Sequence, residues 1–306
     1  MDFLFVVIGI VLLYFGGDLL VDHAVSLADR LGISPLVIGL TVVAFGTSAP
    51  ELATTLASTF QGAPELAVGN VVGSNTANVG LILGVAALIF PLQAQAKFVR
   101  REVPVMILVG LLLAPLLWDG VVTRFEGVLL LLALAGYLVY LFKTDSEAVE
   151  VEEADSSAPL WRDLLLLALG IALLVGGARV LVEGAVGLAR AYGISESVIG
   201  LTLVAFGTSL PELASAAVAA FKKNTDIVLG NVIGSNVFNV LAVLGTTALV
   251  TPVAQPFAGV GLDILIMTAF GAVTLLLMLG RSRLGRTGGA FLLVAYLVYI
   301  AYLFVR

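Results

Sequence analysis

Long apolar runs, separated by short clusters of charged and turn-forming residues, fill almost the whole chain. A helix of about 20 apolar residues crosses the roughly 30 Å hydrocarbon core of a bilayer. Runs such as Val105 to Leu117 do not alternate as the strands of a membrane barrel do. The pattern therefore predicts an all-α membrane protein, because helices satisfy their own backbone groups in lipid. Dividing the runs at charges and turns predicts ten spans, roughly 3–28, 34–60, 65–90, 102–118, 124–142, 163–189, 196–220, 227–250, 258–280 and 288–305.

The positive charges of the loops indicate how these spans lie in the membrane. Lys and Arg accumulate in cytoplasmic loops. If the N-terminus lies outside, the inside loops hold eleven of the fifteen basic residues, three lie outside, and Arg179 falls within a span. We therefore expect both termini on the extracytoplasmic side.

Composition and charge narrow the class of protein further. Hydrophobic residues make up 60% of the chain and charged residues 12%, whereas soluble domains carry roughly 25% charged residues. The net charge of −6 argues against a nucleic-acid partner, and the absence of Cys excludes disulfides and thiolate metal sites. The only long polar connection is the acidic loop 143–162. We interpret it as a solvated linker, with a regulatory cation-binding strip as the alternative.

The chain repeats itself at a shift of 161 residues. The sequence VIGLT at 37–41 recurs at 198–202, and VAFGTS at 43–48 recurs at 204–209. Pro-Glu-Leu-Ala and Gly-Ser-Asn stretches follow in the same register in both copies. Lipid-facing positions need only be apolar, so a duplication for structure alone does not explain why the best-matched stretches are polar.

The shift spans five helices, so the second half enters the membrane from the opposite side. We predict two five-helix inverted-topology repeats, 1–142 and 163–306, joined by the loop 143–162. Their best-matched segments are about 34–90 and 196–250. This architecture is typical of secondary transporters, in which the substrate site lies near the midplane between the repeats.

Each half carries one glutamate inside a membrane span, beside a proline that interrupts the helix. Pro50 has no amide hydrogen, so the carbonyl four residues before it loses its helical partner. Thr47 and Ser48 precede Glu51 by four and three residues, which places both hydroxyls on the helical face of the carboxylate. The second half repeats the arrangement with Thr208, Ser209, Pro211 and Glu212.

These groups are hard oxygen donors that suit a cation. Two carboxylates that meet at the pseudo-twofold axis carry −2, which matches one divalent ion, and Ca²⁺ accepts six to eight oxygens in flexible geometry. Mg²⁺ demands a stricter octahedron, and a chain with no Cys and one His serves soft transition metals poorly. The third and eighth spans add neutral oxygens from Ser74, Asn78, Ser235 and Asn239.

These motifs resemble those of the sodium/calcium exchanger branch of the calcium:cation antiporter superfamily. The two Gly-Thr-Ser-x-Pro-Glu stretches and the two Gly-Asn-x-x-Gly-Ser-Asn stretches look like its paired α-repeats, and the resemblance covers essentially the whole chain. The short central loop is similar to that of the compact prokaryotic form, which implies the inner membrane of a prokaryote.

The resemblance also implies a set of ligands. The implied central Ca²⁺ site uses the carboxylates and backbone oxygens of Glu51, Glu212, Thr47 and Thr208, completed by Asn78 and Asn239. The implied flanking Na⁺ sites use the carbonyl of Ala44 with Ser48 and Ser74, and the carbonyl of Ala205 with Ser209 and Ser235. Relatives of this type often have Asp where this chain has Asn239, which here keeps the site at two carboxylates.

We therefore expect an antiporter that exchanges Na⁺ for Ca²⁺ by alternating access, with one net charge moved per cycle if three Na⁺ exchange for one Ca²⁺. A proton-coupled Ca²⁺ antiporter is the nearest alternative, because glutamates can exchange Ca²⁺ for H⁺. A passive cation channel or an intramembrane enzyme is more remote, and no His-Glu-x-x-His motif supports an enzyme. We expect membrane lipid, Na⁺ and Ca²⁺ as partners, with no cofactor and no obligate protein partner.

The first and sixth spans are expected to move against the other eight helices. Their Gly16-Gly17 and Gly176-Gly177 pairs suit close packing and sliding. Asp18 and Arg179 stand at equivalent positions of these spans and are candidates for a charge pair, whereas His23 is expected to be incidental.

Overall fold

A computed structural model of the chain describes residues 1–145, 159–194, 203 and 205–305. Most of the acidic loop 143–162 and the first residues of the second matched segment, 196–202, lie outside these described residues. The described part is helical apart from four two-residue strands, which confirms the expected all-α class.

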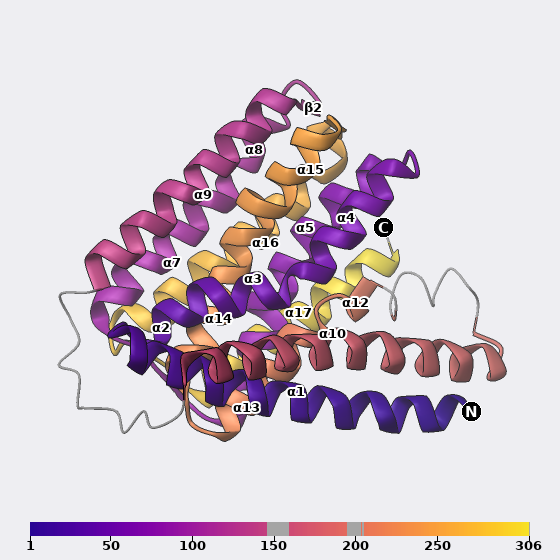
Figure 1. Ribbon diagram of the computed structural model, residues 1–306. Coiled ribbons are helices and arrows are strands. Elements are labelled where there is room, and N and C mark those ends of the chain that lie inside the picture. The colour runs from indigo at the N-terminus through magenta and orange to yellow at the C-terminus, as the bar shows by residue number, and fades with distance from the viewer. Residues whose placement is uncertain (146–158, 195–202, 204, 306) are drawn as a thin grey trace.

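The helices follow one another in the order expected from the apolar runs, with π-helical segments (η) inserted in several of them (Figure 1). The first half contains α1 (Asp2–Leu31), α2 (Pro35–Ile38), η1 (Gly39–Val43), α3 (Ala44–Thr47), α4 (Ala49–Phe60), α5 (Pro64–Ala77), η2 (Asn78–Ile82), α6 (Leu83–Ile89), α7 (Ala96–Leu111), α8 (Leu113–Leu116) and α9 (Arg124–Asp145). The second half contains α10 (Leu160–Ala191), α12 (Ala205–Gly207), α13 (Leu210–Phe221), α14 (Thr225–Phe238), η4 (Asn239–Leu244), α15 (Gly245–Val250), α16 (Phe257–Leu279) and α17 (Arg286–Val305).

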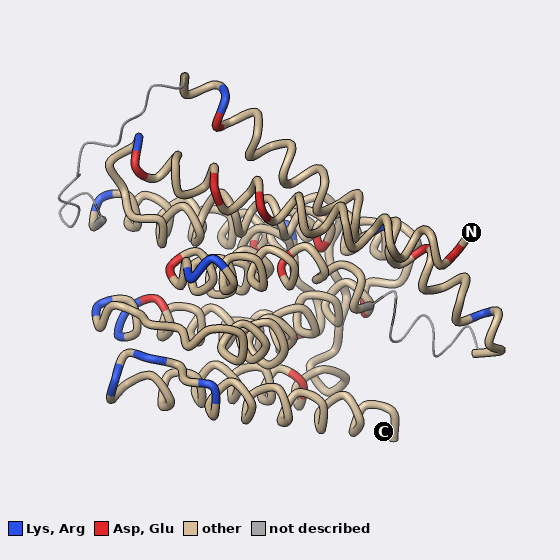
Figure 2. Tube along the Cα trace, turned by 90° about the horizontal axis from the view of Figure 1, so that it is seen from below, with Lys and Arg blue, Asp and Glu red and all other residues tan. Residues whose placement is uncertain are grey.

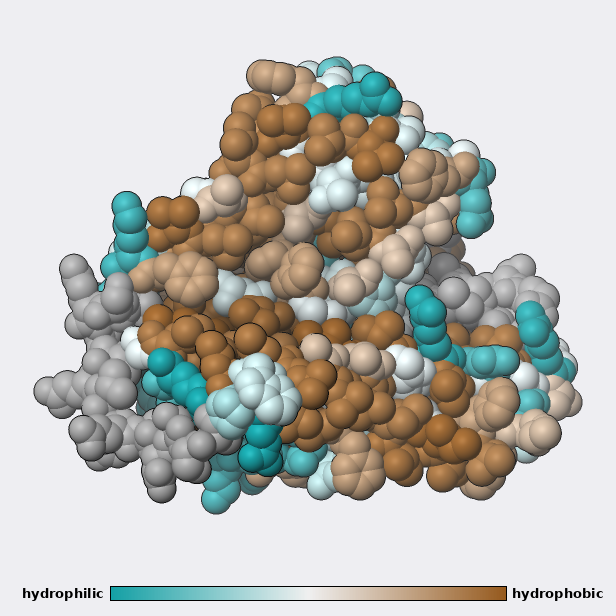
Figure 3. All heavy atoms as spheres, viewed as in Figure 1, coloured by the Kyte–Doolittle hydropathy of each residue, from teal (hydrophilic) through white to brown (hydrophobic). Residues whose placement is uncertain are grey.

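Seven helices of the described part are long and apolar enough to cross a membrane, or eight if the bent pair Pro35–Thr47 and Ala49–Phe60 forms one span. The bend of that pair is 41°. The ten spans expected from the sequence therefore stay a prediction. Large apolar side chains such as Leu132, Leu265 and Val298 are more than half exposed on the outer helices, and the hydrophobic surface in Figure 3 is suited to lipid.

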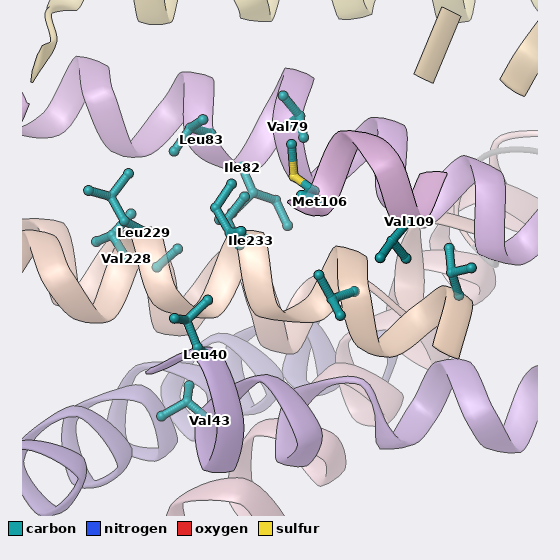
Figure 4. Packing of buried hydrophobic residues seen from close by; sticks show 14 of the residues in the cluster. Leu40, Val43, Val79, Ile82, Leu83, Met106, Val109, Val228, Leu229 and Ile233 are labelled. Carbon is teal, nitrogen blue, oxygen red and sulfur yellow. The ribbon is translucent and has the colours of Figure 1, made fainter. Parts of the chain in front are cut away.

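Two helix pairs form the centre of the bundle. The most apolar window of Thr225–Val250 is 94% buried and that of Pro64–Ile89 is 72% buried, against 17% for the window of α9. Leu229 and Ile233 of α14 pack among residues of η1, η2 and α7 (Figure 4). Continuous apolar sequence thus marks both central and lipid-facing helices, and tertiary packing separates the two kinds.

Local structure recurs in the two halves at the shift of 161 residues. Ala49–Phe60 and Leu210–Phe221 are equivalent helices, as are Pro64–Ala77 and Thr225–Phe238. Two small antiparallel sheets join the halves, and β1 pairs with β4 while β2 pairs with β3. The strands are β1 (Leu92–Gln93), β2 (Val121–Val122), β3 (Val253–Ala254) and β4 (Arg283–Leu284). Because β1 and β3 are themselves equivalent at this shift, the two sheets are counterparts.

The long helices α1 and α10 lie side by side along one edge of the molecule (Figure 1). Small residues permit this contact: a Cβ on Gly16 would lie 2.8 Å from the backbone nitrogen of Leu174, and one on Gly177 would lie 2.9 Å from that of Leu13. Gly17 faces Val218 of α13 instead, and a Cβ on Gly176 would meet nothing within 4 Å. One glycine of each pair therefore makes the expected close contact between the two helices.

We predict opposite effects for alanine at the two adjacent glycines of α10. Gly177→Ala should lower the free energy of unfolding by about 1–3 kcal/mol, because the added methyl meets backbone that cannot move aside. Gly176→Ala should raise it by about 0.5–1 kcal/mol through helix propensity. Melting temperatures of the purified variants in one detergent measure the difference. Shifts of the same sign and size would contradict the close packing.

Candidate cation-binding site

Both intramembrane glutamates follow a break in their helix. Between α3 and α4, Ser48 has φ −80° and ψ 5°, and between α12 and α13, Ser209 has φ −88° and ψ 5°. Pro50 and Pro211 stand in the first turn of the helix that begins after each break, where a missing amide hydrogen is tolerated. The sequence thus bends both helices beside the carboxylates, as expected from the two prolines.

The serine at each break points to the glutamate of the other half. The hydroxyl of Ser209 donates to Oε1 of Glu51 at 3.2 Å, and that of Ser48 donates to Oε1 of Glu212 at 3.3 Å. Ser74 of α5 also donates to Oε1 of Glu51, at 3.4 Å, and lies 3.3 Å from the Ser209 hydroxyl. The sequence placed each serine beside the glutamate of its own half, whereas these hydrogen bonds cross between the halves because the helix is interrupted at the serine.

Four buried oxygens at this crossing have no hydrogen-bond partner among the described residues: Oε2 of Glu51, Oε2 of Glu212, Oδ1 of Asn78 and Oδ1 of Asn239. These four side chains are at most 1% exposed. Buried polar atoms almost always have a partner, so four acceptors without one need an explanation. A bound cation supplies it, because a cation coordinates oxygen and requires no donor hydrogen.

The other expected ligands surround these residues. Thr47, Ser48, Ser74, Ser209 and Ser235 are buried, and Thr208 is half-buried. The carbonyl of Ala44 accepts the backbone N–H of Ser48 at 3.0 Å, so only its second lone pair is available for an ion. Ala205 begins α12, and its side chain lies outside the described residues.

Two asparagines that the sequence analysis did not assign support the site. Asn231 accepts the hydroxyls of Thr47 at 3.1 Å and Ser235 at 3.4 Å, and its amide donates to Ser215 at 2.9 Å. Its equivalent, Asn70, donates to the carbonyl of Glu51 at 3.3 Å. The signal was present, because Gly-Asn-Val recurs at 69–71 and 230–232.

Carboxylates alone do not make this site. Among the described residues, no three His, Cys, Asp or Glu side chains come together as a metal-binding group. Any ion here would have two carboxylate ligands at most, completed by neutral hydroxyl, carbonyl and amide oxygens. Ca²⁺ and Na⁺ accept such oxygens, whereas soft transition metals favour thiolate and imidazole.

A cleft of about 300 Å³ leads to the helix breaks. It is bordered by α4, by α10 and by the segment that follows α12, and it touches Pro50 and Thr208, the neighbours of the two serines at the breaks. Arg179 and Glu183 of α10 line it, together with Ala53, Thr54, Val175, Ala178, Val182 and Gly207.

The charge pair considered for Asp18 and Arg179 is not formed. Lys222, at the end of α13, lies 2.6 Å from Oδ1 of Asp18 and 2.7 Å from Oδ1 of Asp22, so α1 contacts the central helices through an ion pair, while Arg179 lines the cleft. Sequence position could not show this contact, since the residues are about 200 positions apart.

His23 is not incidental in the structure. Its Nδ1 lies 2.8 Å from Oδ1 of the buried Asp163, whose second oxygen accepts the hydroxyl of Ser26 at 3.0 Å and lies 2.5 Å from Nε of Arg30. This cluster joins one end of α1 to the start of α10. It fastens the two long helices to each other rather than to the rest of the bundle.

Comparison with known proteins gives consistent results. A family model described as sodium/calcium exchanger protein matches residues 1–143 and 163–305. The chain is 39% identical to inner membrane protein YrbG of Escherichia coli, over 97% of this chain and 95% of the relative. It is 32% identical to sodium/calcium exchanger MaX1 of Methanosarcina acetivorans, over 99% and 98%. A solved structure of the sodium-calcium exchanger NCX_Mj, soaked with 10 mM Na⁺ and zero Ca²⁺, matches with a TM-score of 0.87 and 34% identity over 98% of each chain.

Proposed function

The chain belongs to the sodium/calcium exchanger protein family, and from that premise we propose that it exchanges Na⁺ for Ca²⁺ by alternating access. Membership makes it an integral membrane cation antiporter rather than an enzyme. The observation that carries the finer proposal is the group of four unpartnered oxygens, two carboxylate and two amide, buried between the halves. Their combined charge balances one Ca²⁺ or a small number of Na⁺ ions, so the two cations compete for the same place.

In this proposal Glu51 and Glu212 hold Ca²⁺ with the backbone oxygens of Thr47 and Thr208, and Asn78 and Asn239 complete the centre. Na⁺ occupies flanking positions made by the Ala44 carbonyl with Ser48 and Ser74, and by the Ala205 carbonyl with Ser209 and Ser235. The crossed hydrogen bonds support this assignment, because each serine lies within reach of the carboxylate that a neighbouring ion would share. An ion that enters therefore competes with hydroxyl groups that the other half supplies.

We further propose ten membrane helices in two inverted repeats, 1–142 and 163–306, joined by a cytoplasmic loop at 143–162. The equivalent helices and the two counterpart sheets support this division. Most Lys and Arg gather at the end of the bundle opposite to the two termini (Figure 2), which supports termini on the extracytoplasmic side of a prokaryotic inner membrane. The cleft beside α10 then opens outward, and Lys222 closes the cytoplasmic side.

Neutralising either glutamate should abolish exchange. Glu51→Gln or Glu212→Gln leaves one negative charge where Ca²⁺ needs two, so Ca²⁺ uptake into Na⁺-loaded liposomes should fall to the level of empty liposomes. Glu65→Gln, at an exposed position in the first turn of α5, is the matched control and should transport normally. Normal uptake by either intramembrane variant would remove the central claim.

Na⁺ rather than H⁺ should drive the flux. At fixed pH, replacing internal Na⁺ by choline should stop Ca²⁺ uptake, and a pH gradient without Na⁺ should not restore it. If three Na⁺ leave for each Ca²⁺ that enters, one positive charge moves outward, so an inside-positive potential should accelerate uptake. Uptake driven by the pH gradient alone would support the proton-coupled alternative, and a flux indifferent to potential would contradict the ratio.

Switching between the two openings requires α1 and α10 to move. The cluster around Asp163 joins them, and we propose that they slide as a unit along the other eight helices. The ion pair of Lys222 with Asp18 and Asp22 holds α1 against α13 while the cleft is open. The equivalent positions in the other half are Gln61, Arg179 and Glu183, so the opposite state has no matching lysine.

Removing this ion pair should shift the protein away from the outward-open state. The chain has no Cys, so Thr54→Cys in the cleft reports accessibility to an impermeant maleimide without background. Adding Lys222→Met should slow labelling from outside by about two- to fivefold, since exposed pairs contribute modestly. Lys222→Arg should restore the rate, and Lys223→Met is the neighbouring control. Equal labelling in all four proteins would contradict a role for the pair.

A further inference from the structure

A second shell of amides decides which atom of Asn239 faces the centre. The amide nitrogen of Asn239 donates to Oδ1 of Asn75 at 3.0 Å, and the amide nitrogen of Asn75 donates to the backbone carbonyl of Asn236 at 3.1 Å. Asn75 lies on α5 and Asn239 begins η4, so this chain of hydrogen bonds crosses between the halves. All three side chains are at most 4% exposed.

The direction of this chain is fixed at one end. A backbone carbonyl can only accept, so the nitrogen of the Asn75 amide must face Asn236. The oxygen of Asn75 must then face Asn239, and it can only accept. Asn239 must turn its nitrogen toward Asn75, which leaves its oxygen on the other side, where it has no partner among the described residues.

The equivalent amide in the other half is not held in this way. Asn236 corresponds to Asn75, but its nitrogen donates to the carbonyl of Val232 in its own helix at 2.7 Å. Neither the oxygen nor the nitrogen of Asn78, which corresponds to Asn239, has a hydrogen-bond partner in the described structure. The two central asparagines are therefore equivalent in sequence and different in their surroundings.

We propose that Asn75 is a positioning residue that makes Asn239 present its carbonyl oxygen, and never its N–H, to the Ca²⁺ held by Glu51 and Glu212. The proposal rests on the proposed function. A reversed Asn239 would aim two N–H groups at the cation and remove one of the few neutral oxygens of a site with only two carboxylates. Asn75 thus favours the divalent ion, whose charge gains most from an oriented dipole, over Na⁺.

The direct test compares two isosteric substitutions. Asn75→Leu removes both links of the chain, while Asn236→Leu removes an amide of the same size at the equivalent position and leaves the backbone carbonyl of residue 236 in place. We expect Ca²⁺ binding to purified protein, measured by calorimetry, to weaken about fivefold in Asn75→Leu and to stay within about twofold of the parent in Asn236→Leu. Na⁺ binding should weaken less than Ca²⁺ binding, and the maximal exchange rate in liposomes should change little.

A third variant separates positioning from packing. Asn75→Asp keeps an acceptor for the Asn239 amide and loses only the donor to Asn236, so Ca²⁺ binding should be no weaker than in the parent. Melting temperatures without ions should be recorded for each variant, and a misfolded Asn75→Leu leaves the aspartate variant and Asn75→Ser, whose shorter side chain releases Asn239, as the deciding pair. Equal Ca²⁺ affinity in the parent and the releasing variant, or equal loss in the releasing and aspartate variants, would overturn the proposal. Failure of the parent protein to bind or exchange Ca²⁺ would instead overturn the proposed function.

Discussion

The structure depends on the burial of two carboxylates at membrane depth. An ionised carboxylate isolated in hydrocarbon is costly by several kcal/mol, so such groups persist only where other groups compensate them. Here each glutamate keeps one oxygen bonded to serine hydroxyls and leaves the other without a partner. Partial compensation of this kind suits an ion that must enter and leave. Full compensation by fixed donors would trap the carboxylates in the empty form, and no compensation would prevent folding.

The interruption of the helices makes this arrangement feasible. A continuous α-helix would consume every carbonyl and hold Ser48 on the face of Glu51, where its hydroxyl could not reach the other half. The breaks at Ser48 and Ser209 have nearly the same φ and ψ, and π-helical segments begin at Asn78 and Asn239. π-helical turns are often found at functional sites because they weaken the regular backbone ladder. Irregular backbone at membrane depth is tolerated here because it is buried in protein.

The sequence predicted features that depend on chain register and missed those that depend on tertiary contact. The shift of 161 residues identified the two glutamates, the prolines and the helical class, because polar residues that keep one register in a lipid-facing chain carry information. Helical spacing failed at Ser48, since periodicity has no meaning across a break. It also could not separate Gly176 from Gly177, whose environments differ although they are adjacent.

Contacts between distant segments lay beyond the sequence for the same reason. His23 meets Asp163 across 140 positions, and neither residue has a repeated counterpart that would have marked it. Asn231 differs, because its Gly-Asn pair recurs, yet an asparagine on a membrane helix can serve packing or support equally well. Only its hydrogen bonds to Thr47 and Ser235 separate these roles.

An inverted repeat makes the two openings of a transporter nearly equivalent, and only side-chain differences can break that balance. If the halves were identical, the outward-open and inward-open states would have equal free energy in the absence of ions. The equivalent backbone positions carry Lys222 in one half and Gln61 in the other, and acids at Asp18 and Asp22 against Arg179 and Glu183. Only the first set forms ion pairs in the state described. The preference for one opening therefore resides at the ends of the sliding helices, far from the glutamates. This separation leaves the central oxygens to discriminate between ions while the peripheral charges set which side they face.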